Sequence, residues 1–396
     1  MNPTFKQMMN EVVEYGSCCE CGSCVLVCPH NVIDYIAGKP KQVAKASATF
    51  DYCGISEGIG CDVCAQVCPR LGEREHAMTE AVFGAELDAD AYRGAFGVYR
   101  RVVAARCTDP EVLARCEDGG VVTGLLAWAR RNDVIDGAVV SAIDKDSPCA
   151  PVPRAVTSVD EIIESASSWY TYCPNNLALE QAEKLDLKRV AFVGVPCQIT
   201  PVRKMQTVDA GYLVNGRKKE KHIERQSKFL KGYGERVSLN IGLLCSEVFT
   251  FEGLMRDVVE GEMNIPLTEI KKFNVKGKVL IYKHSGELIE MNLKQAQEYA
   301  RPECHHCGDF SAELADISCG GVGAMEWTIV VLRTPYGEAL FDRAVADGAL
   351  EVRSMDEFET SMRVMLRLAR KQRQRVPVPP GRGDTFVRPA GYTNPH

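Results

Sequence analysis

The sequence has no apolar run that approaches the roughly 18 residues needed for a membrane helix, so we expect no membrane span of its own. Residues 1–6 include no apolar stretch of the kind that forms the core of a secretory signal, which predicts a cytoplasmic protein in a reducing compartment. Positive charge is not in excess either, and the net charge of −6 argues against a nucleic-acid-binding protein. No G-x-G-x-x-G follows a strand-like run, which excludes the dinucleotide-binding fingerprint.

Cysteine, in contrast, is abundant, with 18 in 396 residues. The hydrophobic content of 45% and the charged content of 25% are typical of a globular protein with a substantial core, and the length fits about two or three domains. In a chain of this length, cysteines grouped in C-x2-C pairs indicate metal ligation rather than a disulfide framework.

The most informative motif is C-x2-C-x2-C-x3-C-P at residues 18–29, which recurs in shortened form at residues 61–69. Thiolates at this spacing bind four-iron (4Fe-4S) clusters, and in two-cluster ferredoxins the last cysteine of each run crosses to the other cluster. The expected ligands of cluster one are Cys18, Cys21, Cys24 and Cys68. Those of cluster two are Cys28, Cys61, Cys64 and Cys53, the last because no other cysteine lies between residues 28 and 61.

Zinc knuckles are the alternative interpretation of this motif, because zinc sites also use C-x2-C pairs. The compact four-cysteine run and its C-P ending favour iron–sulfur clusters. Cys19 stands outside the motif, since no cysteine follows it at the required spacing, and the long interval from Cys53 to Cys61 predicts a bulged loop. The motif therefore predicts a domain that carries single electrons.

The domain organisation follows from where these patterns change. We expect a ferredoxin-like domain at residues 1–76, a connector at 77–97, a larger domain at 98–376 and an extended tail at 377–396. In the larger domain, strand-like runs alternate with helical patterns, which predicts an α/β fold with a mixed or mostly parallel sheet. The strand-like runs are 97–105, 135–143, 189–193 and 237–245, and the helical patterns are 159–165 and 176–184.

Nine cysteines follow residue 100, and Cys304 and Cys307 form the only close pair among them. Cys197 and Cys245 are the best candidates to join that pair, because each follows a predicted strand, and ligands collect at the carboxyl ends of strands in open α/β sheets. Cys319 is a weaker candidate. Buried structural cysteines are the alternative to a third cluster here.

A glycine-containing loop at residues 117–124 is the second candidate site in the larger domain. Gly119 and Gly120 let the backbone approach a ligand closely, and the helical pattern that follows would offer amides and partial positive charge to an anion. A phosphate or the N1 side of a reduced flavin would fit, and an ordinary turn is the alternative. The basic segment at 216–231 has two interpretations as well: a solvated helical insertion, or a docking surface for a partner or an acidic cofactor.

Several blocks of the larger domain, taken in order, resemble successive blocks of the coenzyme F420 hydrogenase/dehydrogenase beta subunits. These blocks are residues 119–124, 134–140, 173–175, 195–198 and 304–323, within a match that extends from about Tyr99 to Gln372. Together with the ferredoxin-like domain, the chain resembles the input subunit of F420H2 dehydrogenases. The resemblance implies an α/β flavin domain with a mixed sheet behind a bacterial-type two-cluster ferredoxin domain.

The same resemblance implies FAD near the 119–123 loop and a third 4Fe-4S cluster held by Cys197, Cys245, Cys304 and Cys307. Cys173 and Cys319 stand where small residues are expected, so either could replace one of these ligands. Arg203 and Lys204 are candidates to meet the acidic tail of coenzyme F420. The full set of expected cofactor contacts is Gly119, Gly120, Val121, Val122, Thr123, Asn175, Asn176, Gln198, Arg203 and Lys204.

The implied function is the exchange of a hydride between coenzyme F420, as substrate, and FAD, with single electrons passing through three clusters to or from a partner. The partner would be a hydrogenase, a formate dehydrogenase, a heterodisulfide reductase or a membrane F420H2 dehydrogenase complex, to which the chain would attach peripherally. One alternative is a ferredoxin-fed reductase of another organic substrate, since the family includes chlorophyll-pigment reductases. The other is a cluster relay without a flavin.

Overall fold

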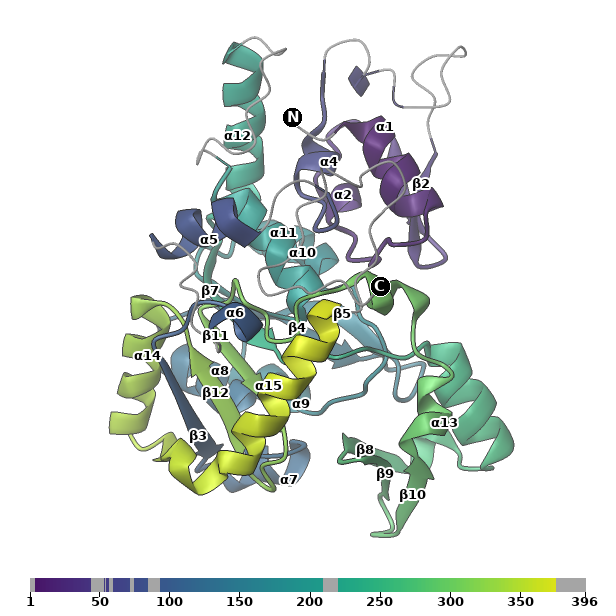
Figure 1. The fold of residues 1–396 in the computed structure, drawn as a ribbon, viewed down its shortest axis with the longest axis vertical. Helices are drawn as coiled ribbons and strands as arrows, with labels where there is room; N and C mark the ends of the chain where they lie inside the picture. The colour runs from purple at the N-terminus through teal and green to yellow at the C-terminus, as the bar shows by residue number, and fades with distance from the viewer. Residues whose placement is uncertain are drawn as a thin grey trace.

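The computed structural model describes residues 4–43, 53, 55–56, 60–71, 75–84, 93–208 and 220–374. A small cysteine-rich module packs against a larger α/β domain, whose central sheet lies between two layers of helices (Figure 1). The 377–396 tail and residues 216–219 of the basic segment lie outside the described residues. Among the described residues, no helix is long and apolar enough to cross a membrane.

The central sheet of the larger domain is mixed, with strand order β13-β3-β12-β11-β7-β6-β4-β5. Its strands are β3 (Arg101–Cys107), β4 (Gly137–Ile143), β5 (Pro151–Val156), β6 (Val190–Gly194), β7 (Val237–Leu243), β11 (Ile317–Gly320), β12 (Thr328–Leu332) and β13 (Leu350–Arg353). The α/β class and the strands predicted from alternation are confirmed, with ends that differ by a few residues.

The directions of the strands place one set of ends at a common edge. β4, β6, β7 and β11 pair in parallel, and β3 points the same way because it reaches β11 through two antiparallel pairings, by way of β12. The carboxyl ends of β3, β11, β7, β6 and β4 therefore meet at this edge, which we call the site edge. Both candidate sites of the larger domain lie there.

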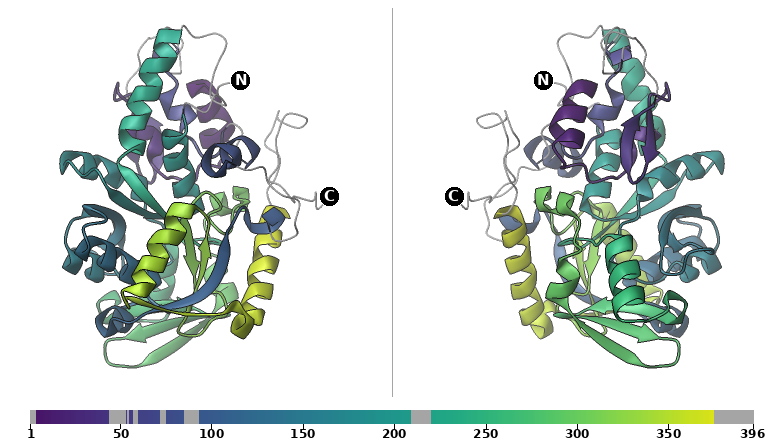
Figure 2. Two further views of the ribbon diagram at one scale, coloured as in Figure 1. Left: turned by 90° about the vertical axis from the view of Figure 1, so that its left-hand side faces the viewer. Right: turned by 90° about the vertical axis from the view of Figure 1, so that its right-hand side faces the viewer.

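Helices cover both faces of the sheet. The alternation of side chains along β6 explains why: Ala191 and Val193 face one apolar cluster, whereas Val190 and Phe192 face another. The first face is covered by α8 (Val121–Arg131), α9 (Val159–Glu164) and α14 (Pro335–Ala346), and the second by α10 (Ala178–Lys184), α11 (Pro196–Gln206), α12 (Glu220–Gly234) and α15 (Glu359–Gln374). Side views show α14 and α15 on opposite sides of the sheet (Figure 2).

The cysteine-rich module contains short helices and one antiparallel hairpin. Its elements are α1 (Phe5–Met8), η1 (Met9–Glu14), α2 (Ser23–Leu26), β1 (Ile33–Ile36), β2 (Lys39–Gln42) and α4 (Val63–Gln66). Helices α5 (Glu75–Phe83) and α6 (Arg93–Phe96) lead to the sheet. Most of the interval between Cys53 and Cys61, where we expect a bulged loop, lies outside the described residues.

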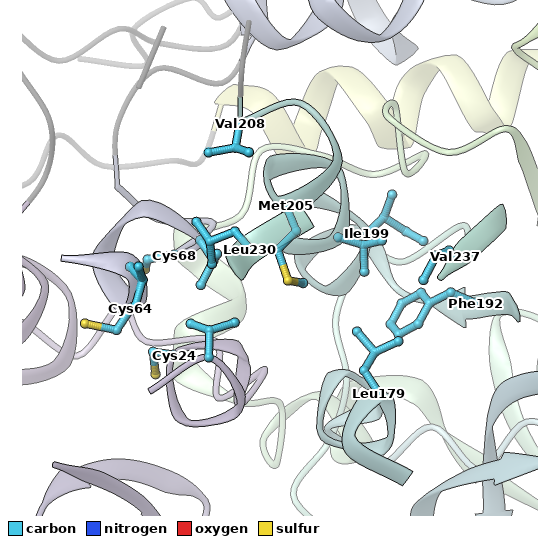
Figure 3. Close-up of a cluster of buried hydrophobic side chains, with 14 of the residues drawn as sticks. Cys24, Cys64, Cys68, Leu179, Phe192, Ile199, Met205, Val208, Leu230 and Val237 are labelled. Atoms are coloured by element: carbon cyan, nitrogen blue, oxygen red, sulfur yellow. The ribbon is translucent and has the colours of Figure 1, made fainter. Parts of the chain in front are cut away.

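Module and domain share one hydrophobic core. Figure 3 shows Met205 of α11 and Leu230 of α12 between the module cysteines and the sheet residues Phe192 and Val237. Helix α12 also bonds the module directly, because the side-chain amide of Gln226 donates to the Gly60 carbonyl at 3.1 Å. Residues 1–76 and 98–376 remain our proposed domain limits, but the packing between them is continuous.

A small antiparallel sheet that we did not predict lies beside the site edge. It consists of β8 (Ile270–Val275), β9 (Lys278–Lys283) and β10 (Leu288–Asn292), and packs with η3 (Phe251–Glu262), η4 (Leu267–Glu269) and α13 (Leu293–Gln297) around its own apolar core. The remaining short elements are α7 (Pro110–Arg115), η2 (Asn175–Leu177), η5 (Pro302–His306) and η6 (Met355–Phe358).

Candidate functional site

The eight cysteines expected to bind clusters one and two fall into two groups in the module. Cys24 has Cys18 and Cys68 as neighbours and Cys21 has Cys24, but Cys24 also lies near Cys64 of the second set. Cys61 has Cys53 and Cys28 as neighbours, and Cys64 has Cys28 and Cys61. These neighbours are compatible with the crossed ferredoxin pattern, but the Cys24–Cys64 proximity joins the two sets, and the assignment of ligands to each cluster remains a prediction.

Burial decides the chemistry of these thiols. It raises the pKa of Cys24 and of Cys64, and raises that of Cys68 to about 11, so the free side chains are neutral at ordinary pH. A metal cluster would replace those protons, which makes cluster binding and folding of the module interdependent. Within the described ranges, no three His, Cys, Asp or Glu side chains converge tightly enough to hold a single metal ion.

The four cysteines expected to bind a third cluster line one cavity, which we call the junction cavity. Cys197 lies in the first turn of α11, directly after β6, and Cys245 follows the carboxyl end of β7. Cys304 is part of η5, and Cys307 ends it. The structure thus brings residues from three distant parts of the chain together at the site edge.

Two other cysteines that we considered as substitutes lie elsewhere. Cys319 is 2% exposed within β11 and packs in the apolar core, where burial raises its pKa to about 12. Cys173 is also buried and interacts with Ser141, with its pKa raised to about 12 by burial. In the part of the chain that the structure describes, neither lines the junction cavity.

The module contributes two residues to this cavity that our sequence interpretation missed, Cys19 and Arg70. Arg70 donates from Nε to the Ser17 carbonyl at 3.2 Å, and from its two terminal nitrogens to the carbonyls of Glu303 at 3.2 Å and His306 at 2.5 Å. The only sequence signals were the Cys18-Cys19 doublet and a cation directly after a Cys-Pro pair.

Charged side chains line the cavity beside the thiols: the cations Arg70 and Arg301, and the carboxylates of Glu247, Glu303 and Asp309. Arg301 is paired with Glu20 at 2.5 Å and lies 4.0 Å from the Tyr172 ring centroid. Arg70 is half-buried and has no ion pair with a carboxylate among the described residues, and a guanidinium withdrawn from water is costly without an anion nearby. Metal-bound thiolates would supply that anion, so the donor set and its charge fit a 4Fe-4S cluster held by the four cysteines.

The 119–123 loop lies at the carboxyl end of β3. Gly119 packs so tightly there that a Cβ atom would lie 2.6 Å from the Ala105 carbonyl oxygen. Gly120, with φ +66°, caps α8, and Val121, Val122 and Thr123 form the first turn of that helix. The glycines thus serve packing and also leave the helix N-terminus at the site edge.

Polar side chains on segments that contact the 116–118 residues lie near this loop, some with partners and some without. Asp118 pairs with Lys276 at 2.9 Å, and Tyr170 donates to the carboxylate of Glu117. Ser167 Oγ, Thr171 Oγ1 and Asn274 Oδ1 are buried and find no hydrogen-bond partner in the part of the chain that the structure describes. Ser167 and Tyr170 also have positive φ angles of 150° and 59°, a strained backbone of the kind that collects at functional sites. Unsatisfied buried atoms on segments that contact the loop fit a polar ligand such as a flavin.

We expected Asn175, Asn176 and Gln198 to contact a cofactor. All three are buried, and their side-chain amides donate to backbone carbonyls of neighbouring segments. Asn176 donates to the Gln198 carbonyl at 3.0 Å, Asn175 donates to the Val193 carbonyl at 2.9 Å, and Gln198 donates to the Cys173 carbonyl. These bonds fix the turn between β6 and α11. In the structure the three residues therefore position Cys197.

Arg203 and Lys204 lie inside the protein, which argues against a contact with the F420 tail. Arg203 pairs with Asp316 at 2.8 Å. Lys204 is 1% exposed and donates to the backbone carbonyls of Cys68 at 2.6 Å and Leu71 at 2.5 Å. Both cations therefore bind groups inside the protein, and the hydrogen bonds of Lys204 connect α11 to the module.

Thiols gathered at the junction of a ferredoxin-like module and an α/β domain are typical of the electron-transfer subunits of oxidoreductases. Two family models match the larger domain: the coenzyme F420 hydrogenase/dehydrogenase beta subunit N-terminal model at residues 102–180, and the C-terminal model at residues 187–358. The chain belongs to this family.

Characterised relatives extend the comparison. The coenzyme F420 hydrogenase subunit beta of Methanosarcina barkeri is 31% identical over 76% of this chain and 97% of its own. The structure of the F420-reducing NiFe hydrogenase complex from that organism contains a chain that matches with a TM-score of 0.59 at 30% identity, over 76% of this chain and 98% of that one.

Two further relatives match more of the chain. One of the subunits of the F420H2 dehydrogenase of Methanosarcina mazei is 29% identical over 84% of this chain and 83% of its own. The coenzyme F420-dependent sulfite reductase of Methanocaldococcus jannaschii is 30% identical over 94% of this chain, which corresponds to 52% of that protein.

Proposed function

We propose that this chain is an F420-linked electron-transfer subunit, which exchanges hydride with coenzyme F420 at a bound FAD and passes single electrons through three 4Fe-4S clusters. The observation that carries the proposal is the junction cavity, in which Cys197, Cys245, Cys304 and Cys307 meet at the same sheet edge as the 119–123 loop. Relatives named for F420-dependent reactions support the choice of substrate.

The residues at the site edge would contact different parts of a bound flavin. Gly119 and Gly120 open the N-terminus of α8 to an anionic or electron-rich part of a flavin, and Asn274, Ser167 and Thr171 offer it unpaired polar atoms. A bound flavin would supply exchange of a hydride on one side and of single electrons on the other. The protein needs no general acid or base for this chemistry, because its task is to position two rings and exclude water.

The junction cavity lies where electrons would leave the larger domain. Its walls come from both parts of the chain, so a cluster there would lie beside cluster one. The module would then deliver electrons to a partner subunit or receive them from it. We propose a cytoplasmic, multi-subunit complex, with a hydrogenase, a formate dehydrogenase, a heterodisulfide reductase or a membrane dehydrogenase as partner.

A reductase partner has specific support. The match to the sulfite reductase relative covers 94% of this chain, which includes the module, but only 52% of that protein. A polypeptide of that kind joins an F420-named activity to a further catalytic part. We therefore propose a terminal reductase as the second candidate partner, with this chain oxidising reduced F420.

The test is anaerobic reduction of the purified, cluster-loaded chain by reduced F420. We expect about one FAD per chain, bleaching of the flavin on mixing with reduced F420, and onward reduction of an artificial one-electron acceptor. Bound FAD without bleaching would show that another substrate supplies the hydride. Absence of bound FAD would favour a cluster relay.

A further inference from the structure

We propose that two residues of the ferredoxin-like module complete the path by which electrons leave the larger domain. Cys19 links Cys197 to Cys21, and Arg70, a positioning cation, raises the reduction potential of the cluster in the junction cavity. This inference rests on the proposed function. The step involves one electron, which passes between the cavity cluster and cluster one while no bond forms or breaks. Neither residue belongs to the expected ligand sets.

Cys19 is placed between the two sets of expected ligands. Its side chain lines the junction cavity together with Cys197, on the larger domain, and it lies two residues before Cys21, in the cluster-one set. Its backbone is continuous with Cys18, a second expected ligand of cluster one. The side chain is 4% exposed, so water is largely excluded from the gap. Sulfur and backbone together offer a short path from one ligand set to the other.

The position of Cys19 is held from both sides. Arg301, next to the loop that carries Cys304, donates to the Cys19 carbonyl at 3.3 Å and pairs with Glu20. Arg70 reaches in the opposite direction, from the module to the Glu303 and His306 carbonyls of the larger domain. The two arginines cross the junction reciprocally, and such contacts fix the separation of groups on either side.

The two arginines differ in how their charge is balanced. Glu20 neutralises Arg301 at 2.5 Å, whereas Arg70 pairs with no carboxylate among the described residues; it bonds to three carbonyls and interacts with the cavity thiols, Cys307 first among them. A reduced cluster carries one more negative charge than an oxidised one. An unbalanced cation stabilises the reduced form more, which raises the potential, because net charge and hydrogen bonds to sulfur set that quantity.

The first experiment measures the reduction potential of the cavity cluster in the whole protein, by titration followed with electron paramagnetic resonance. Arg70→Gln should lower the potential by about 59 mV or more, a tenfold or larger shift in the one-electron equilibrium. Arg70→Lys should restore most of it. The matched control is Arg236→Gln, which removes a half-buried arginine next to the amino end of β7, at the opposite edge of the sheet.

This titration uses a chemical reductant and needs neither F420 nor flavin, so its failure can be told apart from a failure of hydride exchange with F420. An unchanged potential in Arg70→Gln, with all clusters retained, would overturn the role of Arg70. A fall of equal size in Arg236→Gln would also overturn it, because the effect would then be one of net charge alone.

The second experiment follows electron passage after flash reduction of the bound flavin. Cys19→Ala should keep the iron content and the cluster absorption of the natural protein, and slow the appearance of reduced cluster one by about tenfold or more, since a link in the path is removed. Cys19→Ser, which preserves a hydrogen-bonding side chain, should have a smaller effect. Loss of iron in Cys19→Ala would make Cys19 a ligand, and an unchanged rate would remove it from the path; either result contradicts the proposal.

Discussion

At the scale of single residues, Gly119 shows how packing and ligand access can coincide. We expected a glycine there to admit a ligand, yet in the structure a Cβ atom would also meet the Thr328 amide nitrogen at 2.7 Å. Both neighbours of that position are backbone atoms of strands, which cannot move away cheaply. The sequence pattern reveals the glycine but not this second reason for it.

Gly119→Ala should therefore destabilise the fold by about 1–3 kcal/mol, the usual cost of overpacking. The measurement is urea unfolding of the cofactor-loaded protein. Gly277→Ala is unsuitable as a control because its φ is +72°, whereas Gly232→Ala, with nothing within 4 Å of the added atom, should cost little. Equal losses for Gly119→Ala and Gly232→Ala would contradict the packing argument.

Cys245→Ala should remove about a third of the bound iron, because one of three four-iron clusters would lose a ligand. Iron and sulfide analysis of anaerobically purified protein measures this loss. Cys319→Ala is the matched control, since that thiol is buried in the core and away from the cavity. Full iron in Cys245→Ala would remove this residue from the ligand set.

Arg203 and Lys204 show where prediction from single residues fails. Cations near a motif suggested contact with an acidic ligand, but the face of α11 on which a residue lies decides its partners. Their positions place Arg203 against Asp316 and Lys204 against the module backbone. The positions of Cys19, which the motif left aside, and of Arg70 at the cavity were not predicted for the same reason, because they depend on how two distant segments dock.

At the scale of elements, the alternation of strand-like and helical patterns along the sequence was sufficient to predict the main strands of the central sheet. β4, β6 and β7 were expected within a few residues of their observed bounds, because buried parallel strands form near-continuous apolar runs. The small β8-β9-β10 sheet was not predicted, since short exposed strands such as β10 (Leu288–Asn292) have a mixed pattern of burial. Its effect on the site comes through three contacts to the 116–118 segment, from Lys272, Asn274 and Lys276.

Glu117, in that segment, should make stability depend on pH. Burial raises the pKa of its carboxyl above the ordinary 4.5, so the folded state holds the proton more tightly than the unfolded chain. Stability from this group should accordingly fall as pH rises from about 4.5 through the folded pKa. Urea unfolding across that range measures the slope, and Glu117→Gln should flatten it. An identical slope in both proteins would contradict the assignment.

Helix α12 should be an energetic link between module and domain. Leu230 is fully buried in the shared core, and its replacement by alanine should cost about 2–5 kcal/mol. Thermal unfolding of the whole chain tests this. Phe229→Ala, one position away and 36% exposed, is the control and should cost clearly less.

At the scale of the whole molecule, the two parts of the chain depend on each other. The sequence predicted both parts and their order, because cysteine spacing and strand alternation are local signals. It could not show that they share a core or a cavity, since Phe5 and Ile199, for example, belong to one cluster while lying far apart in the chain. Residues that act across the junction were therefore the ones missed.

Removal of iron with a chelator should loosen the module before the larger domain. Many of the buried residues of the module are cysteines, whereas the sheet has apolar clusters on both faces. Hydrogen exchange should rise first in residues 18–28 and 61–68, while the amides of β6 and β7 stay protected. Uniform loss of protection would contradict this order.

The shared core also constrains how this architecture can change over generations. A module that only rested on its neighbour could be exchanged for any other ferredoxin by gene fusion. Here Lys204 reaches the backbone of the module, Arg70 reaches that of the larger domain, and Leu230 packs between them. A substitution on one side calls for an answering one on the other, so the two halves should be inherited together, and chimeras built by swapping residues 1–76 should succeed only when α11 and α12 are transferred with them.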